Sequence, residues 1–237
     1  METAAPSPRW LQGAWWLGFV GSTAWIAVAL AHRTSETPAW LGLLGLLQLV
    51  AGWLLWRRVR AAQATRVGGA VWAALALVGL LVIEQVVVEH ALTPQPGTGR
   101  LLGELVRLVV FVGIAEELWF RGLWFAVAGS RRNLALFGSS VLFGLYHVPH
   151  GWTAVALTAG VGLVFGIARW RGAPVLALGV AHGMLDWCNG VLFPGVQWRI
   201  DVALLPIVYP LACIALGAAM LALSQRPAVI FRDGGRS

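Results

Sequence analysis

The chain has 237 residues, of which 59% are hydrophobic and only 11% are charged, and its mean hydropathy is +0.76. These values exclude an ordinary soluble domain and indicate a membrane protein. The net charge of +7 comes from 17 arginines, which fall in short clusters between apolar segments and not in one surface stripe, and this distribution argues against a nucleic-acid partner.

Eight apolar segments follow one another along the chain, most of them close to the length that a helix needs to cross a bilayer. We therefore predict an all-α polytopic membrane protein, a bundle of about eight transmembrane helices. Three helices occupy residues 1–100, a core of four helices occupies 101–195, and the last helix with a short basic tail occupies 196–237. The predicted spans are 14–31, 39–56, 68–88, 101–128, 134–148, 153–169, 173–192 and 202–224.

The arginines also predict the orientation of the bundle, because positively charged loops are retained in the cytoplasm. Twelve arginines lie on the side of the two termini and three lie on the opposite side, so we expect both termini to be cytoplasmic. The composition, rich in arginine, alanine and glycine, favours a bacterial plasma membrane. The first group is Arg9, Arg57, Arg58, Arg60, Arg66, Arg131, Arg132, Arg169, Arg171, Arg226, Arg232 and Arg236, and the second is Arg33, Arg100 and Arg199.

Some charged residues lie near the predicted ends of spans. Glu84 and Glu89 fall at the far end of the third span, and Glu104 and Arg107 at the far end of the fourth. Water is close at these positions, so we interpret all four as interfacial residues, with Glu104 and Arg107 paired one helical turn apart.

A second group of polar residues falls at membrane depth, where a charge requires a partner or a function. Glu116 and His147 are each fifteen residues from the arginines at 131–132, so two antiparallel helices bring them to a common depth, about 22 Å from the turn at 1.5 Å per residue. Asp186 lies fifteen residues beyond the arginine that precedes the seventh span, with His182 one turn nearer the cytoplasm. Three helices are therefore predicted to contribute polar groups to one layer.

The stretch GIAEELWFRG, at 113–122, places two acids and one arginine inside an apolar run. Glu117 and Arg121 are spaced i,i+4 in the order that favours a helical ion pair. Glu116 points about 100° away from Glu117 on an α-helix and has no such partner. We therefore expect Arg121 to neutralise Glu117 and Glu116 to remain free for chemistry.

A buried carboxylate beside an imidazole can make water nucleophilic, and a second imidazole can donate to the oxyanion that forms, which together suit amide hydrolysis. The side chains of Glu116, His147, His182 and Asp186 could instead hold a divalent metal such as zinc with an open position for water. Buried groups of this kind also line ion paths, so a transporter or a proton-relay protein is the alternative function, followed by a non-catalytic scaffold.

Three ordered motifs resemble those of the CPBP family, the intramembrane proteases that process CAAX proteins and bacteriocins, also called Abi proteins. The motifs are the EExxxR at 116–121, the FxxxH at 143–147 and the HxxxD at 182–186. The resemblance covers residues 100 to 195. It implies an eight-helix intramembrane endopeptidase, whose mechanism in the family is argued both as metal-dependent and as metal-free, acting on a membrane-associated peptide or protein within the lipid bilayer.

The resemblance also implies roles for individual residues. Glu116 would activate water together with His147, and His182 with Asp186 would help to stabilise the oxyanion. The family frequently has asparagine where this chain has Asp186, and an ionised aspartate cannot donate a hydrogen bond. Asp186 would therefore orient His182 or bind a metal, and Asn189, near the same helix face, is a possible replacement donor.

Three further residues near the motifs receive simpler interpretations. Phe143 is expected to shape the site, Tyr146 to anchor the chain at the membrane boundary, and His150 to lie at the wet interface. The two cysteines, Cys188 and Cys213, lie inside apolar segments, and neither indicates a disulfide.

Overall fold

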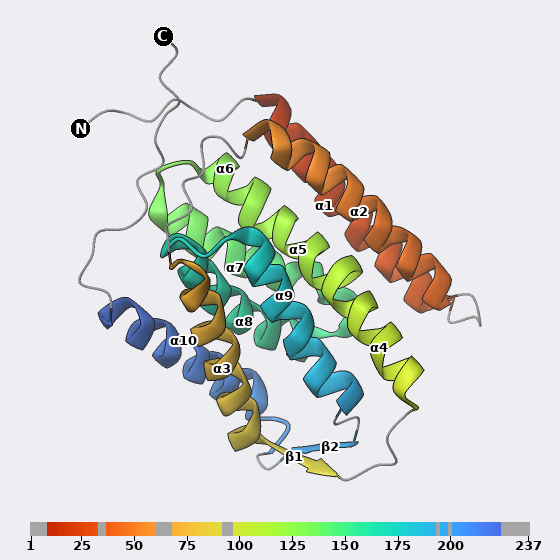
Figure 1. Ribbon diagram of the computed structural model, residues 1–237, viewed down its shortest axis with the longest axis vertical. Coiled ribbons are helices and arrows are strands. Elements are labelled where there is room, and N and C mark those ends of the chain that lie inside the picture. Colours follow the sequence, from red (N-terminus) through yellow and green to blue (C-terminus); the bar gives the residue numbers. More distant parts are fainter. Residues whose placement is uncertain are drawn as a thin grey trace.

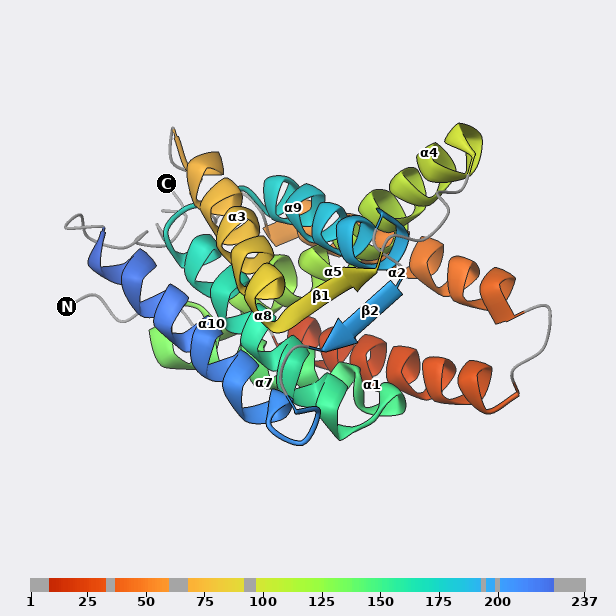
Figure 2. The ribbon, with the colours of Figure 1, turned by 90° about the horizontal axis from the view of Figure 1, so that it is seen from below.

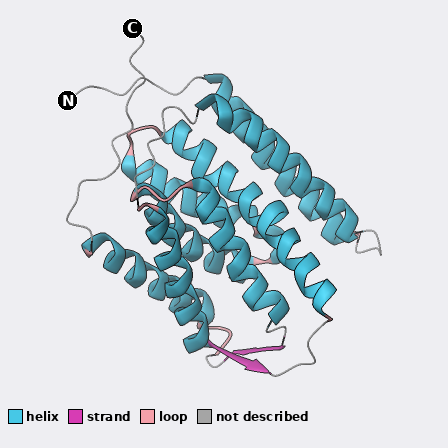
Figure 3. Cartoon of the chain, in the orientation of Figure 1, coloured by secondary structure: helices cyan, strands magenta, loops and turns pink. Residues whose placement is uncertain are grey.

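The computed structural model describes residues 9–32, 37–59, 68–91, 97–192, 195–198 and 201–223. Eight helical rods make up nearly all of this part of the chain, as Figure 3 shows, which confirms the all-α polytopic prediction. Five of the rods are long and apolar enough to cross a membrane. They are α1 (Arg9–Ala31), α2 (Thr37–Val59), α3 (Ala70–Val87), α8 (Trp152–Trp170) and α10 (Leu205–Ala222).

The fourth rod runs without a break from residue 98 to residue 128, but its hydrogen-bonding pattern alternates between α and π. Its backbone stays in the right-handed helical region at each junction, so the rod is continuous. Turns of π-helix are rare and frequently accompany functional sites. The order is α4 (Thr98–Val106), π-helix η2 (Arg107–Ile114), α5 (Ala115–Glu117), π-helix η3 (Leu118–Leu123) and α6 (Trp124–Ala128).

The fifth rod joins η4 (Leu134–Gly138) to α7 (Ser139–Tyr146) and stops at His147, which has φ −92° and ψ 7°. A short 3-10 turn, η5 (Val148–His150), follows, and it contains the proline that prevents the α-helix from continuing. The seventh rod joins α9 (Val175–Trp187) to η6 (Cys188–Leu192).

Helix α8 lies in the middle of the bundle and packs against α7 and α10 (Figure 1). Helix α9 packs closely on η2 because glycines, which have no side chain, lie at their contact. A Cβ at Gly183 would meet backbone atoms of Val109, and a Cβ at Gly113 would meet the Gly179 carbonyl. The α1–α2 hairpin lies along one side of the bundle, with α10 on the other side (Figures 1 and 2). These contacts bring α5, α7 and α9 together.

A small two-stranded sheet was not predicted from the sequence. Strand β1 (Val88–Ala91) pairs antiparallel with β2 (Gly195–Trp198), in the register Val88↔Trp198 to Ala91↔Gly195 (Figure 2). The two strands follow the ends of α3 and η6, where the helical hydrogen bonds stop and the backbone groups require other partners. No period-two pattern marks these four-residue strands, since apolar membrane spans surround both.

The predicted interfacial charges behave in two ways. Arg107 forms an ion pair with Glu104 at 2.7 Å, as expected. Glu84, also interpreted as interfacial, has a partner that the sequence did not predict: it is half-buried and accepts a hydrogen bond of 2.6 Å from the buried Tyr209 of α10. The side chain of Glu89 lies outside the described part, as do Arg33, Arg60, Arg66, Arg199, Arg226, Arg232 and Arg236.

Candidate active site

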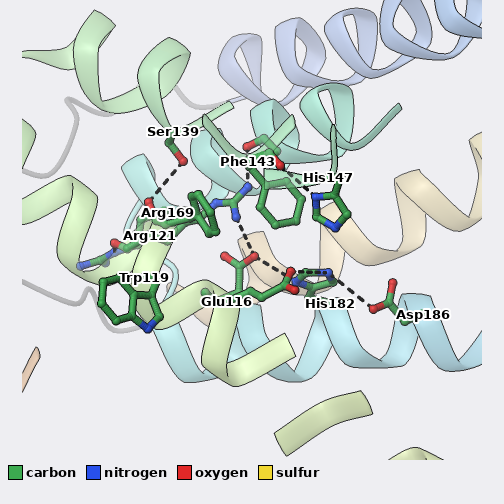
Figure 4. Close-up of polar contacts among 12 residues, drawn as sticks. Glu116, Trp119, Arg121, Ser139, Phe143, His147, Arg169, His182 and Asp186 are labelled. Carbon is green, nitrogen blue, oxygen red and sulfur yellow. Dashed lines mark hydrogen bonds and ion pairs between the residues drawn. The ribbon is translucent and has the colours of Figure 1, made fainter. Parts of the chain in front are cut away.

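The predicted ion pair between Glu117 and Arg121 is present and fully buried. Arg121 Nη1 donates to Glu117 Oε1 at 2.9 Å, and Nη2 donates to the backbone carbonyl of Gly162 on α8 at 2.9 Å. The guanidinium also lies over the ring of Phe143, 4.5 Å from its centroid. Arg121 therefore links the acid-bearing rod to α7 and α8 (Figure 4).

His182 reaches this pair from α9 and is itself buried. Its Nδ1 donates to Glu117 Oε1 at 3.2 Å, so the same carboxylate oxygen binds both Arg121 and His182. Its Nε2 lies 3.9 Å from Glu116 Oε2 and 3.7 Å from Asp186 Oδ2. These two distances are too long for hydrogen bonds and suit a bridging water or substrate oxygen. The imidazole thus faces a carboxylate with each of its nitrogens.

Glu116 has a different environment from its neighbour Glu117. Its side chain is only 10% exposed, yet it forms no hydrogen bond with any described residue, and its Oε2 is buried. Glu117 Oε2 also has no partner in the described part, but the Oε1 of Glu117 accepts two hydrogen bonds. A buried acceptor without a partner requires an explanation, and a binding or catalytic function is one. Glu116 thus has no hydrogen-bond partner in the described part of the chain, and its catalytic role stays a prediction.

His147 ends α7, and its Nδ1 lies 2.9 Å from the carbonyl oxygen of Phe143. A carbonyl can only accept, so Nδ1 carries the proton, and Nε2 of the neutral ring is left as an acceptor. The Phe143 ring packs edge-on against His147, with centroids 4.9 Å apart, and against His182, with centroids 5.6 Å apart. Phe143 thus contacts both imidazoles (Figure 4).

Residues 98–188, which include the whole of this cluster, match the model of a protein family described as type II CAAX prenyl endopeptidase, Rce1-like. This segment belongs to the Rce1-like family. The match confirms the family that the three motifs indicated, and it identifies the protein as a multi-pass membrane peptide hydrolase. No curated protein and no solved structure matches the chain.

The described acids and imidazoles of the Rce1-like segment do not form a preformed metal site. Among the described residues, no group of three or more histidine, cysteine, aspartate or glutamate side chains is arranged to hold a metal ion. Glu117 and the Phe143 carbonyl contact only Nδ1 of His182 and of His147, respectively. Metal-binding histidines commonly make such a contact with their second nitrogen, so metal binding stays a prediction. We therefore derive no reaction step through a metal.

Asp186 and Asn189 differ from the other predicted site residues in exposure or in contacts. The Asp186 side chain is 36% exposed, so the site is most open on its side, and its nearest charged partner is His182. Asn189 is half-buried on η6 and forms no hydrogen bond with His182, and its role as a donor stays a prediction.

One contact of the site lies outside the Rce1-like segment and was missed from the sequence. Tyr146, interpreted as a boundary anchor, is buried and donates to Gln48 Oε1 of α2 at 3.2 Å, while Gln48 Nε2 donates to its hydroxyl at 2.9 Å. The Gln48 carbonyl also accepts from Trp119 Nε1 at 3.0 Å. The signal was available, because Gln48 is the one strongly polar side chain in the span predicted at 39–56.

Proposed function

We propose that the protein is an intramembrane endopeptidase in which Glu116, assisted by His147, activates the water that hydrolyses a peptide bond. The observation that supports this most is the buried, unpartnered Oε2 of Glu116, 3.9 Å from His182 Nε2. The family description adds the substrate class, a membrane-associated protein ending in a CAAX-type sequence. An open side near the half-exposed Asp186 is the proposed path for the peptide.

The proposed reaction begins with a water between Glu116 and His147. Glu116 accepts a proton from the water while the unprotonated Nε2 of His147 accepts its other hydrogen bond, and the oxygen adds to the peptide carbonyl carbon. The carbonyl oxygen becomes an oxyanion, to which His182 donates from Nε2; in this proposal His182 is an imidazolium that carries a proton on each nitrogen throughout. The proton on Glu116 then passes to the leaving amine as the carbon–nitrogen bond breaks, which leaves a carboxylic acid and an amine.

Glu117 and Asp186 are assigned to positioning in this proposal. Glu117 accepts from His182 Nδ1, which turns the opposite nitrogen toward the reacting atoms. Asp186 lies 3.7 Å from that nitrogen and is an acceptor when ionised, so it cannot itself donate to the oxyanion. Its proposed role is to hold His182 in this orientation from the opposite side.

Metal assistance is the second mechanism, and it would use the same four side chains, Glu116, His147, His182 and Asp186. A bound zinc ion would supply a water of lowered pKa and polarise the peptide carbonyl. The two mechanisms differ in one measurement. The protein is dialysed against a chelator and its cleavage activity is measured. Activity persists if Glu116 and His147 act without a metal, and it is lost and then restored by added zinc if a metal is required.

The test of the proposed function is the Glu116→Gln variant, which keeps the size of the side chain and removes the base. The full-length protein is reconstituted in vesicles, and cleavage of a prenylated and of an unprenylated CAAX peptide is followed by mass spectrometry. We expect turnover to fall at least about a hundredfold. The matched control is Glu104→Gln, which alters a partly exposed acid of the same rod that pairs with Arg107 outside the site. Wild-type turnover in Glu116→Gln would refute the proposal.

A further inference from the structure

A groove of about 540 Å³ lies between α7 and α10, and helix α8 forms its floor. The floor includes the small residues Ala156, Ala159 and Gly160. The walls include Phe137 and Ile214, and at least half of each of these residues is exposed. The volume lies in the range of known ligand sites. The groove is apolar over most of its length and faces outward from the bundle, where lipid would surround it.

The groove has a polar end, at Arg132 and Asn133. The preceding arginine, Arg131, is bonded to the end of α6, since its Nε and Nη2 donate to the carbonyls of Ala128 and Val127 at 3.2 and 3.4 Å. Arg132 is exposed and forms no such bond with any described residue. The positive-inside rule assigns this end to the cytoplasm. A free guanidinium therefore lies where an apolar groove meets the predicted membrane surface.

The length of the groove matches one leaflet of a bilayer. Its floor extends from Ala156 to Ile167 on α8, eleven steps along the helix, which is about 16 Å at 1.5 Å per residue. Half of a typical hydrocarbon core is about 15 Å. The wall on α10 has the same extent, from Pro210 to Leu221. The groove thus begins near the predicted cytoplasmic surface, and its length is close to that of one leaflet.

We propose that this groove is a lipid site, which binds one acyl chain of an anionic phospholipid of the cytoplasmic leaflet with the phosphate on Arg132. An arginine matches a phosphate in charge and in hydrogen-bonding geometry. The small residues of the floor leave room for the chain, and the groove is about as long as one leaflet is thick. A neutral lipid would fill the groove but leave Arg132 without its anion.

The opposite face of α8 belongs to the active site, so the groove is separate from the path of the peptide. On that face the Gly162 carbonyl binds Arg121, and the Phe165 ring lies 5.6 Å from His182. At the inner end of the groove, Gly160 brings α8 against Pro210 and Cys213 of α10, where a Cβ would have only 3.2 Å of clearance. These contacts separate the groove from the active site.

The experiment measures lipid retention and is independent of peptide cleavage, so its failure is distinct from failure of the proposed protease. Full-length protein is placed in nanodiscs of phosphatidylcholine and phosphatidylglycerol in equal parts, extracted in mild detergent, and analysed by native mass spectrometry. Wild type and Arg131→Ala are expected to retain phosphatidylglycerol. Arg132→Ala is expected to bind it roughly fivefold more weakly, as for one basic contact at a membrane surface.

A second variant tests the apolar part of the site. Ala218→Trp fills the groove from α10 at an exposed position and is expected to abolish retention of both lipids. The phospholipid assignment is overturned if wild type retains neither lipid, if it retains the two equally, or if Arg132→Ala and Ala218→Trp both behave as wild type. It is also overturned if a prenylated peptide displaces the bound lipid in competition, because the groove would then be a substrate site.

Discussion

Glu117 and His182, 65 residues apart in the chain, are joined by a buried hydrogen bond of 3.2 Å. The same oxygen of Glu117 accepts from Arg121, so the ion pair within one helix also fixes the imidazole of another. Glu117 therefore connects the stability of the bundle to the orientation of His182, and the two effects can be separated by mutation.

Removal of Arg121 alone should be strongly destabilising. Arg121→Met leaves Glu117 buried without its cation, and the loss of one partner of a buried pair costs about 3–5 kcal/mol. The double variant with Glu117→Leu removes both charges and should recover most of the stability. Its turnover should remain low, because His182 has lost the acceptor on Nδ1. Unfolding in detergent and cleavage are both measured, and recovery of activity in the double variant would contradict the positioning role of Glu117.

Asp186→Asn separates a positioning role from a metal ligand. The amide keeps an oxygen that accepts from His182, and its NH₂ group adds a donor, so turnover should stay within about tenfold of wild type. Asp186→Ala removes the acceptor and should reduce turnover further. If Asp186 binds a metal, both variants should lower the zinc content of the purified protein, as measured by elemental analysis.

The hydrogen bonds between Gln48 of α2 and Tyr146 of α7 should contribute to the free energy of unfolding as a buried neutral pair does. Tyr146→Phe leaves Gln48 without a partner for its amide, at a cost of about 1–3 kcal/mol. Gln48→Leu combined with Tyr146→Phe should be closer to neutral, since no polar group is then left unpaired. A cycle of the two single variants and the double variant, followed by thermal unfolding, measures the coupling. A coupling near zero would mean that water replaces the missing partner.

The close packing of α9 on η2 should be intolerant of a methyl group. A Cβ at Gly183 would meet backbone atoms of Val109 and Leu108, so Gly183→Ala forces the two helices apart at the level of His182. We expect a loss of about 1–3 kcal/mol and a large fall in turnover. Gly103→Ala is the control, because its Cβ would meet nothing within 4 Å and alanine favours helix. Equal stability of the two variants would contradict the packing.

The sequence predicted that separate helices bring these side chains into one cluster, because position along a helix follows from a fixed rise per residue. Glu116 and His182 lie at one level, and Phe143 brings His147 to the same cluster. The prediction that Glu116 and Glu117 point apart did not indicate which residue of another helix lies beside them. His182 lies between them, with one nitrogen toward each, and spacing within a single helix cannot reveal a side chain that enters from another helix.

The features that were missed depend on contacts between distant segments. Gln48 lies 98 residues from Tyr146, and Glu84 lies 125 residues from Tyr209. An apolar span marks a polar residue as unusual but does not identify its partner. The π-helical turns around Glu116 also leave no clear sequence signal, since any apolar run can form an α-helix or include a π-turn.

The most direct test of the central claim is a structure of the protein with a peptide analogue whose scissile amide is replaced by a phosphinate, which imitates the tetrahedral intermediate. The account predicts one phosphinate oxygen within hydrogen-bonding distance of Glu116 Oε2 and His147 Nε2, and the other oxygen bound to His182 Nε2. A phosphinate that binds away from Glu116, with that side chain still unpartnered, would contradict the account.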